Sequence, residues 1–74
     1  PITELTDRMR AIFGLVVEAY LERGQPVGSK ALAGSVNLSS ASIRSVMQSL
    51  EERGLLTHPH TSAGRIPTET GLRL

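Results

Sequence analysis

The chain has 74 residues, enough for one small domain, so we predict a single domain over residues 1–74. It contains no cysteine, which excludes disulfides and thiol chemistry and fits a cytoplasmic location. No apolar run approaches the ~20 residues of a transmembrane helix, and no signal peptide is recognisable. The formal net charge is +1, so a basic surface must come from the placement of cations. Because the chain opens on Pro1 and stops at Leu74 just after a helix-start signal, we interpret it as a piece of a longer protein.

A first helix is predicted between Thr6 and Gly24. The Thr6 hydroxyl suits an N-cap, and Gly24 suits the left-handed residue that commonly ends a helix. Leu15 lies roughly opposite the apolar stripe of this helix. It is either an ordinary exposed leucine or a contact with a part of the protein beyond this chain. The stripe repeats at helical spacing and consists of Met9, Ile12, Phe13, Val16, Val17, Tyr20 and Leu21.

A second, shorter helix is predicted after an extended segment at residues 25–28. Proline drives its predecessor out of the helical region, so a short strand is expected over residues 26–28. Ser29 suits the N-cap of the helix, which we expect to end near Val36. Residues 37–38 then form a tight turn into the next helix.

The third helix is predicted from its N-cap, Ser39, to Arg53, with Gly54 as its stop. Its apolar residues fall on one stripe and face the core: Ile43, Val46, Met47 and Leu50. The opposite face is mostly small and hydrogen-bonding rather than charged. It consists of Ala41, Ser45, Gln48 and Glu52, flanked by Ser42, Arg44 and Ser49.

A small β-hairpin is predicted after the third helix. Residues 55–57 form its first strand, and Arg65 with Ile66 forms the return strand, closed by Pro67. Thr68 then caps a fourth helix, of which only the first turn is present. The predicted fold is therefore mainly α with a small β-hairpin: a winged helix-turn-helix with a three-helix core.

The second and third predicted helices form a helix-turn-helix, which places its second helix in the major groove of DNA. Arg44 suits a phosphate or guanine contact, and Gln48 suits a bidentate contact to adenine. Serines at the helix start suit phosphates, and Arg65 suits a phosphate or the minor groove. The alternative is that all these residues are ordinary solvated surface. The predicted DNA-binding residues are Ser29, Lys30, Ser39, Ser40, Ser42, Arg44, Ser45, Gln48, His60, Thr61, Ser62 and Arg65.

Metal binding and catalysis are not expected. His58 and His60 invite a zinc interpretation, but zinc needs further ligands, and the chain offers no cysteine and no nearby carboxylate before Glu69. A Ser-His-Asp triad lacks a nucleophile elbow, and the only aspartate, Asp7, starts the first helix. We therefore predict no enzyme activity and no cofactor.

The sequence resembles the N-terminal domain of the heat-inducible transcription repressor HrcA family. The resemblance covers residues 5–74, and its matching stretches are residues 25–30, 39–47, 50–55 and 59–69, with Gly71 and Arg73 beyond them. It implies a bacterial repressor that binds an inverted-repeat operator upstream of chaperone genes. It also implies a homodimer formed through an absent C-terminal region, support by the chaperonin, and release of DNA on heat stress.

Two residues depart from the pattern of this family. Members often carry asparagine at the position of Ser45 and proline at the position of Ser40. The shorter Ser45 side chain reaches less far into a groove.

A winged-helix protein-interaction module is the alternative function, and a metal sensor would need ligands that the chain lacks. In a DNA-binding domain we expect Arg44 and Arg65 to share one positive face.

Overall fold

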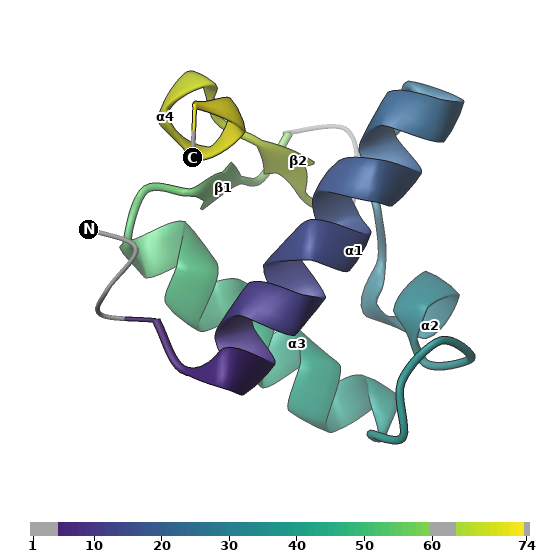
Figure 1. Ribbon diagram of the computed structural model, residues 1–74. Coiled ribbons are helices and arrows are strands. Elements are labelled where there is room, and N and C mark those ends of the chain that lie inside the picture. Colours follow the sequence, from purple (N-terminus) through teal and green to yellow (C-terminus); the bar gives the residue numbers. More distant parts are fainter. Residues whose placement is uncertain (1–4, 60–63, 74) are drawn as a thin grey trace.

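Four helices and one hairpin make up the fold, which a computed structural model describes for residues 5–59 and 64–73. Helices α1 and α3 cross, α2 packs beside them, and the hairpin lies against one end of α3 (Figure 1). This is the predicted fold, a three-helix core with a small β-hairpin. The elements are α1 (Asp7–Arg23), α2 (Ser29–Leu32), α3 (Ser40–Glu52), β1 (Leu56–Thr57), β2 (Ile66–Pro67) and α4 (Glu69–Leu72).

The core lies between α1, α3 and the hairpin. Helix α1 has the predicted ends: the Thr6 side chain accepts a hydrogen bond from the Met9 N–H, and Gly24 adopts a left-handed φ of 68°. Since aromatic residues are scarce, aliphatic side chains and methionine fill most of the interior. Its buried apolar residues are Leu5, Met9, Ile12, Phe13, Val16, Val27, Leu32, Ile43, Met47, Leu50, Leu55 and Leu56.

Two leucines of α1 differ from expectation. Leu15 is half-buried and packs against the core, because α2 covers a second side of α1; Leu15 shares a shallow depression there with Ala31 and Leu32. Leu21, predicted to lie in the apolar stripe, is 69% exposed. Leu21 lies two residues before the end of α1, at the rim of an apolar depression that Val17 and Leu72 also line. The predicted phase of Leu15 is therefore wrong, and Leu21 is the exposed leucine.

Helix α2 is shorter than predicted. It ends at Leu32 rather than near Val36, and the Ser35 N–H bonds the Leu32 carbonyl at 2.9 Å in a tight turn. Gly34 lies in this segment and disfavours further helix, because glycine loses more backbone entropy on ordering. Ser29 is the first helical residue and is buried, with Gly28 as the N-cap, so the predicted cap at Ser29 is also wrong.

The hairpin is antiparallel, with Leu56 opposite Pro67 and Thr57 opposite Ile66. The return strand is thus shifted by one residue from the prediction. Arg65 instead forms an isolated antiparallel bridge with Val27, so the strand expected over residues 26–28 is reduced to this single bridge. Among the described residues, no helix is both long and apolar enough to cross a membrane.

Candidate nucleic-acid interface

The outer face of α3 is polar and accessible. Ser42, Arg44, Ser45 and Gln48 are exposed, while the opposite side of α3 packs into the core through its apolar stripe. This matches the predicted orientation of α3. The side chains that suit DNA contacts therefore project from the body of the domain.

Two serines at the start of α3 bind each other. The Ser39 hydroxyl accepts the Ser42 N–H at 3.1 Å and donates to the Ser42 hydroxyl at 3.1 Å. The predicted N-cap at Ser39 is therefore confirmed. The Ser42 N–H is committed to this cap, so of its polar groups the hydroxyl is the one suited to a phosphate. Ser40, the first residue of α3, is half-buried.

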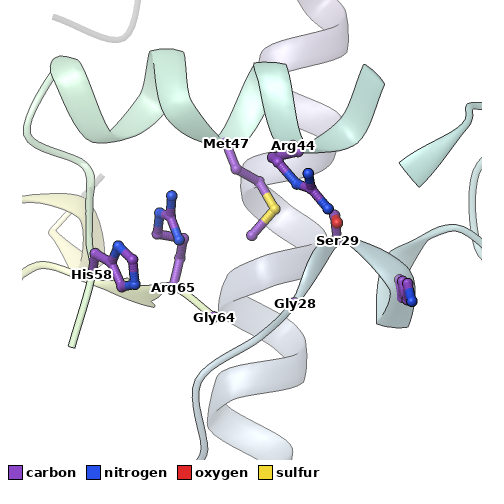
Figure 2. A pocket seen from close by; sticks show the side chains of 8 residues that line it. Gly28, Ser29, Arg44, Met47, His58, Gly64 and Arg65 are labelled. Carbon is purple, nitrogen blue, oxygen red and sulfur yellow. The ribbon is translucent and has the colours of Figure 1, made fainter. Parts of the chain in front are cut away.

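A depression of about 400 Å³ opens between the start of α2, the middle of α3 and the hairpin. Lys30 from α2, Arg44 from α3, and His58 and Arg65 beside the hairpin strands line it. Figure 2 shows Arg44 and Met47 projecting into it from α3, with His58 and Arg65 approaching from the hairpin side. Arg44 and Arg65 thus both line this depression.

Arg65 differs from the extended cation that the sequence suggested. Its Nε donates to the Glu51 Oε1 at 2.7 Å, and its side chain is only 16% exposed. Glu51 lies on α3, seven residues after Arg44 and so on the same edge of that helix. Sequence reasoning missed Glu51. The spacing from Arg44 predicts only the edge of α3 on which Glu51 lies. It does not predict the contact with Arg65, which lies 14 residues further along the chain.

The remaining predicted site residues are less uniform in their placement. Ser29 is buried and lines the depression, and Lys30 beside it is exposed. His60, Thr61 and Ser62 lie outside the described residues. Within residues 5–59 and 64–73, no three His, Cys, Asp or Glu side chains gather as metal ligands would.

Comparison with known proteins places the chain among winged-helix domains. A protein-family model described as the ribonuclease R winged-helix domain matches residues 16–74. A crystal structure described as that of a hypothetical protein superimposes with a TM-score of 0.91 at 44% sequence identity. That likeness covers 99% of this chain and 24% of the other, so the shared part is one domain of a larger molecule.

Curated relatives agree over the whole chain. The heat-inducible transcription repressor HrcA of Erythrobacter litoralis is 72% identical over 100% of this chain and 22% of its own length. The repressor of the same name from Sphingopyxis alaskensis is 70% identical over 100% of this chain and 22% of its length. These relatives are named as repressors rather than as enzymes, and the chain spans about a fifth of their length. The chain belongs to the winged-helix domain family, and throughout its length it is similar to the N-terminal part of heat-inducible transcription repressors HrcA.

Proposed function

We propose that this chain is the DNA-binding domain of a bacterial transcription repressor of heat-shock genes, which recognises an inverted-repeat operator. The observation that carries the proposal is the position of the exposed polar face of α3 beside the depression lined by Lys30 and Arg44. An α-helix with small polar residues fits the major groove, and cations at its edge attract the phosphates. The names of the curated relatives support the same function.

The candidate residues other than Arg65 each have a role in this proposal. Helix α3 enters the major groove, where Gln48 contacts a base and Arg44 contacts guanine or a phosphate. Ser45 lies on the same face, and its short side chain restricts it to close contacts. Phosphates are bound by Lys30 beside Ser29, by the serines at the start of α3 and by the hairpin region with His60, Thr61 and Ser62.

The proposal extends to the assembly that the relatives imply. An inverted repeat is read by two domains related by a two-fold axis. We infer that a region beyond this chain forms the homodimer, and that the repressor acts on the bacterial nucleoid in the cytoplasm. Support by the chaperonin belongs to the same inference, which follows from the resemblance to HrcA.

Salt-dependent DNA binding tests the proposal. The full-length protein is used to select a preferred duplex from a random pool, and this duplex and a scrambled one are titrated over a range of salt concentrations. We expect the selected duplex to bind at least ~10³-fold tighter than the scrambled duplex. We also expect the logarithm of the binding constant to fall linearly with the logarithm of the salt concentration. Equal binding of the two duplexes at every salt concentration would refute sequence-specific recognition.

A pair of arginine substitutions provides the matched control. Arg44→Ala removes a cation from the depression, and Arg8→Ala removes the same charge from the exposed surface at the start of α1. We expect Arg44→Ala to weaken binding clearly and Arg8→Ala to leave it nearly unchanged. Equal losses in the two variants would mean that total charge, rather than the α3 surface, governs binding.

A further inference from the structure

Arg65 connects three parts of the domain through its backbone and its side chain. Its N–H donates to the Val27 carbonyl at 2.9 Å, and its carbonyl accepts the Val27 N–H at 2.8 Å. Its Nε donates to Glu51 on α3 at 2.7 Å. Arg65 itself precedes β2 directly. One residue therefore ties the hairpin both to the segment before α2 and to α3.

The surroundings of Arg65 leave little freedom. A Cβ atom on Gly64 would lie 3.0 Å from the Pro26 carbonyl carbon and from the Val27 nitrogen, so the two backbones are in close contact. The Arg65 side chain is 16% exposed and the Glu51 side chain 32% exposed, which places the ion pair partly out of water. A charge-assisted hydrogen bond of this length has a strong preference for one geometry. The orientation of the hairpin relative to α3 is therefore coupled to this pair.

We propose that Glu51 and Arg65 form a positioning pair that fixes the hairpin against α3. In this proposal Arg65 supports DNA binding through the placement of the hairpin, and not as a phosphate contact of its own. An isolated negative charge on the edge of α3 that bears Arg44 would repel phosphate. The pair with Arg65 explains why the Glu51 carboxylate is tolerated there. The inference rests on the proposed DNA-binding function and assigns Glu51 a role that its charge alone would argue against.

Four variants of the full-length protein test the pair: Glu51→Ala, Arg65→Ala, the double variant and Glu51→Gln. We expect each alanine substitution to weaken binding of the selected duplex roughly fivefold, as estimated for loss of a partly exposed charge-assisted hydrogen bond. The double variant should be no weaker than Arg65→Ala, because Glu51 contributes to binding only through Arg65. Glu51→Gln should stay within about twofold of wild type, since the amide oxygen still accepts a hydrogen bond from Arg65.

The salt dependence of the double variant separates positioning from direct contact. This variant has the same net charge as wild type, so a positioning pair leaves the salt slope unchanged. A phosphate contact by Arg65 would lower the slope by about 0.9 in the double variant. Thermal unfolding of every variant identifies the temperature range in which all are folded, and binding is compared there. A loss of stability with unchanged binding would assign the pair a role in folding only, and would overturn the proposal.

Glu52→Ala is the control for charge, because Glu52 is the next residue on α3 and is exposed. Glu52→Ala should bind DNA as tightly as wild type or slightly more tightly. If Glu51→Ala strengthens binding in the same way, Glu51 is only a repulsive charge and the positioning pair is wrong. A wild-type protein that selects no duplex would overturn the proposed function and this inference together. A wild-type protein that selects a duplex, with a double variant of reduced salt slope, would overturn the inference alone.

Discussion

Gly71 in α4 is at a position where a single methyl group should destabilise the domain. A Cβ atom there would fall far inside van der Waals contact of the Leu55 carbonyl oxygen and 3.1 Å from Phe13 Cζ. The Leu55 carbonyl cannot move aside freely, because it also accepts the Thr68 N–H at 3.0 Å. In Gly71→Ala, therefore, either that hydrogen bond or the packing of α4 against Phe13 must change.

The size of the effect follows from two opposing contributions. Overpacking a well-packed site costs about 2–3 kcal/mol, whereas alanine in place of glycine stabilises a helix by about 1 kcal/mol. We therefore expect Gly71→Ala to lower the free energy of unfolding by about 1–2 kcal/mol. For a domain of this size, a loss of that order lowers Tm by about 5–15 °C.

Thermal and urea unfolding followed by far-UV circular dichroism measure this change. Gly14→Ala is the matched control, because Gly14 lies in the middle of α1 and a Cβ atom there would meet nothing within 4 Å. The control should raise the free energy of unfolding by about 0.5–1 kcal/mol through helix propensity alone. If Gly71→Ala is as stable as wild type while Gly14→Ala behaves as expected, the close approach of α4 to Leu55 is wrong.

Three further predictions concern α1 and α3. Thr6→Ala should lower the free energy of unfolding by about 1 kcal/mol in urea denaturation, because the Met9 N–H loses its cap, and Thr6→Ser should restore most of it. Leu15→Glu should cost more than about 1 kcal/mol and Leu21→Glu less than about 0.5 kcal/mol, since only Leu15 packs on the core; equal effects would contradict the orientation of α1. In fluorescence-anisotropy titrations, Arg44→Ala should weaken binding of the selected duplex by about 1–3 kcal/mol if Arg44 contacts guanine. A salt slope lower by about one, with equal loss on all duplexes, would assign Arg44 to a phosphate instead.

The ends of α1 and the start of α3 were predicted correctly, because residues close together in the chain determine them. The Thr6 cap, the left-handed Gly24 and the apolar stripe between them are enough to define α1, and Ser39 does the same for the start of α3. The end of α2 was missed because its apolar residues continue the helical spacing as far as Val36. Gly34 interrupts the helix there, and one glycine within an otherwise helical pattern is a weak signal.

Contacts between residues far apart in the chain account for the features that the sequence did not predict. Leu15 is half-buried because α2 covers a second side of α1, and one stripe per helix assumes one packing partner. Gly71 is a second example. It approaches Leu55 closely, although Leu55 precedes the hairpin and Gly71 follows it in α4. Neither contact has a periodicity of its own, so neither could be found before the helices were placed in space.

Arg65 illustrates the limit for functional residues. Its position beside the hairpin predicted an outward cation, but Glu51 on α3 meets its Nε instead. With eight Lys and Arg residues and seven Asp and Glu residues, the chain has nearly enough carboxylates to neutralise its own cations. Whether a given arginine faces a ligand or a carboxylate of the same domain therefore depends on tertiary placement. Arg44, exposed on α3 at the rim of the depression, is for this reason a stronger candidate for direct DNA contact than Arg65.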